Sequence, residues 1–466
     1  MKNYKNLFKD KKITIMGLGL LGRGLGYTKF LAQCGADLIV TDLKNSDQLA
    51  TSVKALSKFP NIKFVLGEHR LEDFRDRDMI VKSAGVPMDS VFIAEAMKNN
   101  IPIEMDVSLF AKCAPGVQII GVTGTRGKSM TTNLIYEILK SQEKFLNKSV
   151  FIGGNVRGVA TLPLLSKVKD GDILVAELDS WQLQGFGPTP HSFLGTGEHG
   201  FSPHISVFTS FMTDHMNYYR DNMDLYFADK ANIFKYQKAG DTLVISPGMK
   251  KLIPKDIQSK LVVVKPNTVS DWKFAVPGVH QMENMACAVE VVKIFGIPES
   301  KIKKAVKDFG GLEGRLELVK NIRGIKIYND NNATTPEATI SGLQALATSA
   351  RKDLAEKRII LICGGNDKNI PVTDFVKAIN KYCKLVVTIP GTGTNKLISD
   401  SALGPIRKLK VESIKTENLK QAFDTATSSA KKGDIILFSP AFSSFSQYNN
   451  EYERNDEFVK LVKKFK

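Results

Sequence analysis

The sequence is poor in the features that mark secreted, membrane-spanning and metal-cluster proteins. Its five cysteines lie far apart and form no Cys-x-x-Cys pair, at Cys34, Cys113, Cys287, Cys363 and Cys383. Disulfide frameworks and zinc ribbons need closely spaced cysteines, so we expect free thiols in a reducing compartment. No run of about 18 apolar residues occurs, and the first twelve residues lack the apolar core of a signal peptide. We therefore expect a cytoplasmic protein without a membrane span.

Acidic residues are scarce as well, because 65 Lys and Arg stand against 48 Asp and Glu, for a formal net charge of +17. A basic excess can serve nucleic acid, an anionic membrane surface or acidic small molecules. The lysines are scattered along the chain, and no RNA-binding signature accompanies them. We interpret the excess as solvated surface with a bias toward phosphorylated ligands, and we expect no nucleic acid and no membrane among the partners.

Apolar strands that alternate with helical segments are abundant. With 466 residues the chain is too long for one core, and its length favours three domains. Residues 13–40 give a strand, a glycine turn, a helix and a second strand. Further strands are expected at 79–83, 117–122, 173–178, 205–211, 243–246, 261–264, 325–328, 358–363, 384–388 and 434–439. The pattern predicts an α/β protein with domains at 1–107, 108–311 and 312–466.

The segment Gly121–Ser129, with the sequence GVTGTRGKS, carries the strongest functional signal. It joins an apolar strand to a segment, Met130–Lys140, whose apolar residues recur at helical spacing. Such a turn presents backbone N–H groups to phosphates, while its lysine neutralises charge and its serine offers a hydroxyl to Mg²⁺. Val122 stands where the usual pattern has its first glycine. We predict an ATP-binding loop made by Gly124, Thr125, Arg126, Gly127, Lys128 and Ser129.

A second glycine turn, Gly17–Gly22 with the sequence GLGLLG, follows a strand and opens a helix. Asp42 stands 20 residues beyond Gly22, at the end of the next strand. This is the dinucleotide fingerprint in its expected context, and alone it would favour NAD and a dehydrogenase. A nucleotide-sugar diphosphate can use the same turn, and the separate ATP loop favours that interpretation.

Three further residues suit phosphate or metal chemistry. Glu177 lies at the end of the strand 173–178, where a carboxylate can hold Mg²⁺. His215 follows another apolar strand, and Lys230 comes 15 residues later. Singly, a strand-end acid is usually solvated, a histidine structural and a helix lysine exposed. Their joint spacing favours one site.

Taken together, the GTRGKS loop, the Glu177-Leu-x-Ser-x-Gln-Leu run, the Asp-His pair and the lysine 15 residues on resemble the central domain of the Mur ligases. The likeness extends over nearly the whole chain, through Ser83–Gly85, Gly153–Asn155, Gly278–Asn284, Gly311–Arg315, Asn329–Asp330, Gly364–Lys368 and Ser439–Ser444. Within this family the chain is most similar to the members that add glutamate to UDP-N-acetylmuramoyl-L-alanine.

The resemblance implies an ATP-dependent amide ligase of peptidoglycan-precursor synthesis, which adds D-glutamate through an acyl phosphate and uses ATP and Mg²⁺. Such chemistry depends on positioning and charge neutralisation. The implied catalytic residues are Lys128, Glu177, His215 and Lys230. The implied metal ligands are Ser129, Glu177, His215 and Lys230, the last as a carbamate. The partners would be the two small-molecule substrates, and a monomer is expected.

The resemblance also implies an N-terminal Rossmann-like domain, a central P-loop domain with a mostly parallel sheet, and a C-terminal Rossmann-like domain. Further ATP contacts would come from Gln281, Asn284, Arg315 and Asp330. The UDP-sugar would contact Gly19, Leu20, Leu21, Gly22, Asp42, Ser83 and Asn155. Glutamate would contact Thr334, Lys368, Ser444 and Phe445.

The amino-acid site departs from the resemblance. Asn332 stands where relatives that take D-glutamate have a lysine, and Glu451 stands where they have an aromatic residue. The run Thr334-Thr-Pro-Glu-Ala also resembles relatives that add L-glutamate, so the stereochemistry stays open. Met130 and Asp179 occupy positions that usually carry hydroxyl residues. Residues 189–203 form an insertion to which the sequence gives no role.

Other interpretations remain in view. A sister ligase could add another amino acid. Folylpolyglutamate synthesis is disfavoured, because that synthetase begins at its P-loop domain and would have no use for residues 1–107. An NAD-binding or nucleotide-sensing protein with a degenerate ATP site is the alternative from another class, and the intact Lys128, Glu177, His215 and Lys230 count against it.

Overall fold

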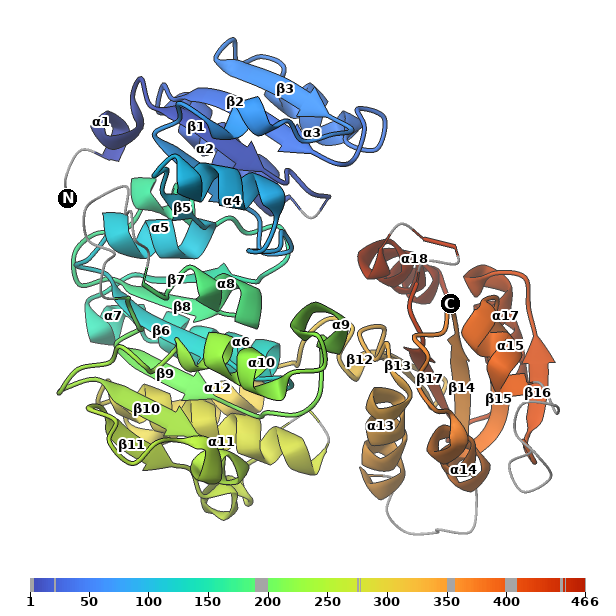
Figure 1. Cartoon of the computed structure of the whole chain (residues 1–466). Coiled ribbons are helices and arrows are strands. Elements are labelled where there is room, and N and C mark those ends of the chain that lie inside the picture. Colours follow the sequence, from blue (N-terminus) through green and yellow to red (C-terminus); the bar gives the residue numbers. More distant parts are fainter. Residues whose placement is uncertain are drawn as a thin grey trace. The chain divides into compact units, whose positions relative to one another are not determined.

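A computed structural model describes residues 4–20, 22–188, 200–274, 276, 278–349, 357–398, 409–444, 447–448 and 450–465. The chain divides into two compact units (Figure 1). The first unit comprises Met1–Trp272 and Met282–Val306, and the second comprises Lys273–Gln281 and Lys307–Lys466. Both units are α/β, as the sequence predicts. The domain limits at 107 and 311 stay predictions.

The first unit begins with a five-stranded parallel sheet in the order β3-β2-β1-β4-β5. Its strands are β1 (Lys12–Met16), β2 (Asp37–Asp42), β3 (Ile62–Leu66), β4 (Met79–Lys82) and β5 (Ile103–Glu104). Its helices are α1 (Tyr4–Phe8), α2 (Arg23–Gln33), α3 (Ala50–Leu56), η1 (Leu71–Phe74), α4 (Val91–Lys98) and α5 (Asp106–Cys113).

A six-stranded parallel sheet follows in the same unit, in the order β11-β10-β9-β6-β8-β7. Its strands are β6 (Gln118–Thr123), β7 (Val150–Gly154), β8 (Ile173–Glu177), β9 (Ile205–Phe208), β10 (Thr242–Ile245) and β11 (Lys260–Val263). The helices after β6 are α6 (Lys128–Lys140), α7 (Glu143–Leu146), η2 (Leu162–Ser166), α8 (Ser180–Gln184), α9 (Met216–Tyr219) and α10 (Met223–Ala231). Later come η3 (Pro247–Leu252), η4 (Pro266–Val269), α11 (Val279–Lys293) and α12 (Glu299–Asp308), of which α11 up to Gln281 and α12 from Lys307 are counted with the second unit.

The second unit holds a mixed six-stranded sheet in the order β12-β13-β17-β14-β15-β16, in which β12 and β13 pair antiparallel. Its strands are β12 (Glu317–Ile322), β13 (Ile325–Asn329), β14 (Ile359–Gly364), β15 (Cys383–Ile389), β16 (Glu412–Lys415) and β17 (Ile435–Ala441). Its helices are α13 (Pro336–Ser349), α14 (Thr373–Tyr382), α15 (Thr392–Ile398), α17 (Leu419–Ser429) and α18 (Glu451–Lys464).

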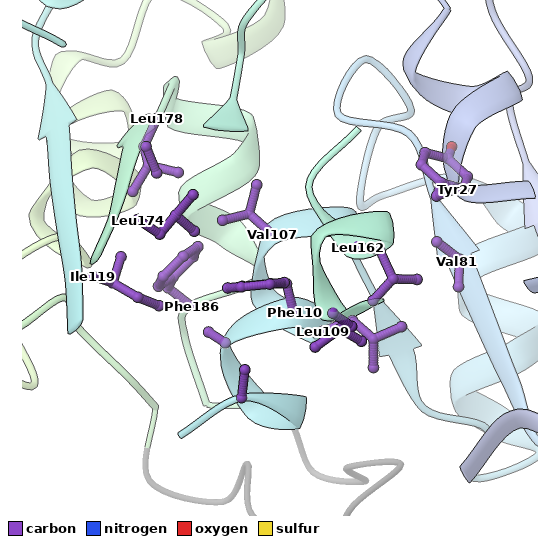
Figure 2. Close-up of a cluster of buried hydrophobic side chains, with 14 of the residues drawn as sticks. Tyr27, Val81, Val107, Leu109, Phe110, Ile119, Leu162, Leu174, Leu178 and Phe186 are labelled. Carbon is purple, nitrogen blue, oxygen red and sulfur yellow. The ribbon is translucent and has the colours of Figure 1, made fainter. Parts of the chain in front are cut away.

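The two sheets of the first unit share one apolar core (Figure 2). It extends from Val81 of β4 through Phe110 of α5 and Leu162 of η2 to Leu174 of β8, all at most 1% exposed. Burying a large apolar side chain contributes about 1.5–3 kcal/mol. The first sheet is therefore docked on the second by the same hydrophobic effect that folds each of them.

The strand order explains where functional loops can gather. In the second sheet β6 lies between β9 and β8. The strands that follow β6 in the chain, β7 and β8, lie on one side of it, and the later strands β9, β10 and β11 lie on the other side. Loops at the carboxyl ends of parallel strands open a crevice at such a point. The Gly124–Ser129 loop follows β6, Glu177 ends β8, and Asn155 follows β7. The topology thus brings these three together at one edge.

Candidate active site

The phosphate-binding loop has a backbone that only glycine accommodates at two positions. Gly124 has φ of 146° and Gly127 has φ of 88°, both in the region that favours glycine. A Cβ at Gly124 would lie 2.1 Å from Thr209 Oγ1, and one at Gly127 would lie 2.3 Å from Asn284 Oδ1. Asn284, predicted to contact ATP, therefore lies directly beside the loop.

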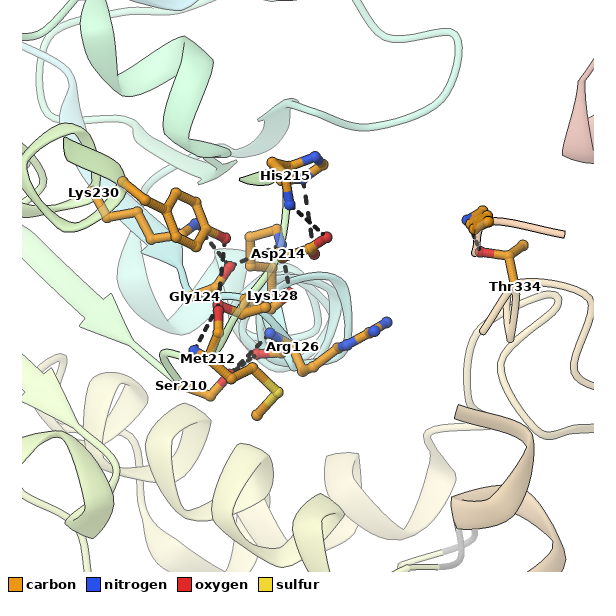
Figure 3. A network of polar contacts seen from close by, with 12 residues as sticks. Gly124, Arg126, Lys128, Ser210, Met212, Asp214, His215, Lys230 and Thr334 are labelled. Carbon is orange, nitrogen blue, oxygen red and sulfur yellow. Dashed lines mark hydrogen bonds and ion pairs between the residues drawn. The ribbon is translucent and has the colours of Figure 1, made fainter. Parts of the chain in front are cut away.

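Two residues that the sequence did not single out, Thr209 and Ser210, hold this loop, and Figure 3 shows Ser210 beside it. The N–H groups of Thr125 and Arg126 donate to the carbonyl and the hydroxyl of Ser210, at 2.8 and 2.9 Å. The Thr209 hydroxyl donates to the Arg126 carbonyl at 2.6 Å. Both residues directly follow β9, the neighbour of β6. The sequence predicts a strand over 205–211 that would include both residues, whereas β9 ends at Phe208, so the sequence carried no signal for their role.

Lys128 and Lys230 converge on one carbonyl (Figure 3). Their Nζ atoms donate to the Gly124 oxygen at 2.9 and 3.0 Å. Lys230 is only 1% exposed, and its Nζ lies 4.9 Å from the centre of the Tyr226 ring. Burial, and next the positive charge of Lys128, lower the pKa of Lys230 to about 7. Near neutral pH, the Lys230 side chain is therefore a neutral, nucleophilic amine in a large fraction of the molecules.

His215 lies close enough to Lys128 and Lys230 for their charges to act on it. Its backbone is in the left-handed conformation, with φ of 56°. Its ring centre is 4.7 Å from that of Trp181 and 6.3 Å from that of Tyr226. Burial lowers the pKa of His215, although the Asp214 carboxylate opposes this shift. The imidazole therefore stays neutral near pH 7, which is the form that binds metals.

Glu177 is 5% exposed at the end of β8, and its backbone carbonyl accepts the Asn155 N–H at 2.7 Å. Its carboxylate and the Ser129 hydroxyl are the oxygen ligands that Mg²⁺ prefers, so the donor set fits this ion. Within the described ranges no group of three or more His, Cys, Asp and Glu is arranged to hold a metal. Asp179 is used differently, because its carboxylate accepts the Gln182 N–H at 2.7 Å and caps α8.

The first-sheet turn is built around Asp42 and Ser83. Gly17, Gly19 and Gly22 all have positive φ, at 91°, 66° and 81°. The Asp42 carboxylate accepts the N–H of Gly19 and that of Lys44, both at 2.9 Å. The Ser83 hydroxyl donates to the Gly17 carbonyl. Asp42 and Ser83 thus shape the turn. Leu20 is 43% exposed beside it, and Leu21 lies outside the described residues.

The structure adds two basic residues near this turn. Arg23 Nη1 donates to Asn155 Oδ1 at 2.6 Å, which connects the turn with the residue after β7. Lys82 is 1% exposed at the end of β4, and its Nζ donates to the Val86 carbonyl at 2.9 Å. Burial lowers the pKa of Lys82 to about 8, although the charges of Asp179 and Asp229 oppose the shift. Neither residue belongs to a motif by which the sequence could flag it.

In the second unit, Asp330 is buried at the end of β13. Its carboxylate accepts the Ser439 hydroxyl at 2.8 Å and the Leu316 N–H at 3.0 Å. Burial raises the pKa of Asp330 to about 7. Leu316 has φ of 51° and follows Arg315 directly, so Asp330 holds the turn that carries Arg315. Gln281, in the same unit, contacts His280 through its side-chain amide at 3.2 Å.

The residues predicted to bind glutamate belong to this unit as well. Lys368 Nζ donates to Thr334 Oγ1 at 3.1 Å (Figure 3). Ser444 is 3% exposed, and Phe445 lies outside the described residues. Asn331 Nδ2 donates to Asn332 Oδ1 at 3.3 Å and to the Glu451 backbone carbonyl at 2.9 Å. Residues 189–199 of the insertion also lie outside the described residues.

Three family models match the chain in succession. They are "Mur ligase MurD-like, N-terminal domain" over residues 11–104, "Mur ligase middle domain" over 122–265 and "Mur ligase, glutamate ligase domain" over 314–442. Among curated relatives, a Roseiflexus sp. (strain RS-1) protein named UDP-N-acetylmuramoylalanine–D-glutamate ligase is 32% identical, over 98% of this chain and 99% of its own. One of the same name from Borreliella afzelii (strain PKo) is 33% identical, over 97% and 98%.

Solved structures agree on the fold. The UDP-N-acetylmuramate-alanine ligase of Thermotoga maritima superposes with a TM-score of 0.60 at 18% identity, over 97% of this chain and 99% of that one. Together with the phosphate loop, the matched Mur ligase domains and the full-length relatives show that the chain is an ATP-dependent amide ligase. The chain belongs to the Mur ligase family. Among the described helices, none is long and apolar enough to cross a membrane.

Proposed function

We propose that this protein joins D-glutamate to UDP-N-acetylmuramoyl-L-alanine at the expense of ATP. The observation that carries the proposal is the convergence of Lys128 and Lys230 on the Gly124 carbonyl of the phosphate loop. Full-length likeness to relatives of that name supports the choice of substrates. The division into domains at 1–107, 108–311 and 312–466 is part of the proposal.

The reaction begins when a carboxylate oxygen of the alanyl group attacks the γ-phosphorus, and ADP leaves. The glutamate nitrogen then attacks the acyl carbon and loses a proton, and phosphate leaves. In the proposal, Gly124–Ser129 and Asn284 hold ATP, while Lys128 balances the charge that develops on the transferred phosphoryl group. Gln281, Arg315 and Asp330 complete the ATP contacts.

Mg²⁺ is part of the proposal, and when bound it supplies positive charge beside the phosphate oxygens. Ser129, Glu177 and His215 would hold it. We assign Lys230 a carbamate, formed when its neutral amine adds CO₂ and releases a proton. This assignment is supported by the lowered pKa of Lys230, which makes the neutral amine accessible. It converts a cation, which would repel Mg²⁺, into an oxygen ligand.

The glycine turn with Asp42, Ser83 and Asn155 would bind the UDP-sugar. Thr334, Lys368, Ser444 and Phe445 would bind glutamate. One chain supplies all of these residues, so we propose a monomer, active in the cytoplasm where ATP and the nucleotide-sugar are available. The choice of D-glutamate over L-glutamate is the most specific part of the proposal, because Asn332 and Glu451 depart from the family pattern at the amino-acid site.

The test is phosphate release from ATP with UDP-N-acetylmuramoyl-L-alanine and one acceptor at a time. D-glutamate, L-glutamate and lysine are offered in separate reactions, with a reaction lacking any acceptor as the control. Release with D-glutamate alone supports the proposal. Release with L-glutamate alone corrects the acceptor, and no release with any of the three overturns the proposed ligation.

A further inference from the structure

Arg23 lies between the two sheets of the first unit, and no sequence motif assigns a role to it. It is the first residue of α2, directly after the Gly17–Gly22 turn, and its side chain is half-buried. Its Nη1 donates to Asn155 Oδ1 at 2.6 Å, which is short for a bond from a charged donor. Arg23 directly follows the glycine turn of the first sheet, and Asn155 lies in the loop after β7 of the second sheet.

The two partners are held close by the backbone around them. A Cβ at Gly26 of α2 would lie 2.7 Å from the Ala160 Cβ, and one at Gly22 would lie 3.6 Å from the Gly158 Cα. The Asn155 N–H donates to the Glu177 carbonyl at 2.7 Å. Helix α2 therefore packs directly on the loop 155–160. The Arg23–Asn155 hydrogen bond joins this helix to that loop beside the end of β8.

The hydrogen bond also fixes the orientation of the Asn155 amide. A guanidinium can only donate, so Oδ1 of Asn155 faces Arg23 and its Nδ2 donors face away. Neither Asn155 Nδ2 nor Arg23 Nε and Nη2 meets an acceptor among the residues that the structure describes. Asp106 lies close enough for its charge to interact with Arg23, yet its two carboxylate oxygens already accept the N–H groups of Thr161 and Leu162, both at 2.7 Å.

A cation and an amide thus present unused donors beside a glycine turn. Arginine is suited to bind two oxygens of one phosphate because its N–H groups form a planar fork. We infer that Arg23 binds the diphosphate of the nucleotide-sugar substrate, and that Asn155 positions the guanidinium while its own Nδ2 serves the same ligand. This inference rests on the proposed function, since it names a specificity-determining residue for that substrate.

The test compares Arg23→Met with Lys29→Met, an exposed positive charge removed from the same helix. Calorimetry without ATP measures the dissociation constants of UDP-N-acetylmuramoyl-L-alanine, UDP and UMP, and a non-hydrolysable ATP analogue is titrated separately. For Arg23→Met we expect ~10–100-fold weaker binding of the two diphosphates, from the loss of charged hydrogen bonds. UMP and the ATP analogue should change less than about twofold, Lys29→Met should resemble the wild type, and Arg23→Lys should recover part of the loss.

Unchanged binding of both diphosphates by Arg23→Met overturns the inference, and so does an equal loss for UMP and UDP, which would make the role of Arg23 structural. Circular dichroism of each variant establishes that it is folded. If Arg23→Met does not fold, the ratio of UDP to UMP affinity in Arg23→Lys decides, since an unchanged ratio overturns the inference. Failure of the wild type to bind the nucleotide-sugar at all is a different result, because it removes the proposed function itself.

Discussion

Replacing Lys82 by methionine should make the first unit more stable. The Lys82 side chain is 1% exposed, and its ammonium has a hydrogen bond to the Val86 carbonyl at 2.9 Å. Burial lowers its pKa from 10.5 to about 8, even though Asp179 and Asp229 favour the charged form. At pH 7 the folded protein therefore carries a buried positive charge on Lys82 that lowers its free energy of unfolding.

The magnitude follows from the two pKa values. Keeping Lys82 protonated in the fold at pH 7 costs about 3 kcal/mol relative to the unfolded chain. Its bond to Val86 returns about 1 kcal/mol, so the methionine variant should gain ~2 kcal/mol at pH 7. Between pH 8 and 10.5 the unfolded chain binds more protons at this position, so wild-type stability rises with pH in that window. The advantage of Lys82→Met should shrink by about 2 kcal/mol between pH 7 and 9.5.

Urea unfolding at these two pH values, followed by tryptophan fluorescence, measures the difference. Both tryptophans, Trp181 and Trp272, belong to the first unit, so the signal reports on the unit that contains Lys82. Lys29→Met, which removes an exposed lysine, is the control and should show no pH-dependent difference from the wild type. A Lys82→Met protein that is less stable at pH 7, or a difference independent of pH, would refute the reasoning.

Three further substitutions test the first unit. Lys128→Ala should lower phosphate release by at least ~100-fold while the affinity for the nucleotide-sugar, measured by calorimetry, changes little, because the charge lost lies on the ATP loop; loss of both would contradict the separate sites. Lys230→Ala should be inactive in the same assay and partly recovered by added acetate, and full activity without acetate would remove Lys230 from the metal site. Gly26→Ala should cost ~1–3 kcal/mol in urea unfolding, because its Cβ would lie 2.7 Å from the Ala160 Cβ; a double variant with Ala160→Gly should recover the loss, and failure to do so would locate the strain elsewhere.

The interior strands could be predicted from the sequence, whereas most edge strands could not. Strands such as β6, β8 and β14 are buried along nearly their whole length and appear as continuous apolar runs. Of the six edge strands that the structure describes, only β11 was expected. β12 and β16 alternate irregularly between exposed and half-buried residues, and β5 is two residues long. A strand paired on one side only needs less apolar surface, so its sequence carries a weaker signal.

The candidate site divides along a similar line. The Gly124–Ser129 loop could be predicted because the phosphate-binding turn needs fixed residue types at fixed spacing. Ser210 and Arg23 act through contacts made 84 and 132 residues away along the chain, with Arg126 and Asn155. Their importance arises from which strands become neighbours, and no local pattern in one sequence records that.

The backbone at His215 limits which side chains natural variation can place there. With φ of 56°, the position disfavours β-branched and bulky residues and admits glycine, asparagine, aspartate and histidine most readily. Apart from glycine, those residues all offer a nitrogen or oxygen donor. The backbone conformation of the turn after β9 therefore favours, by itself, side chains that can bind a metal or a phosphate. Substitutions tolerated at this position are drawn from the same few residue types.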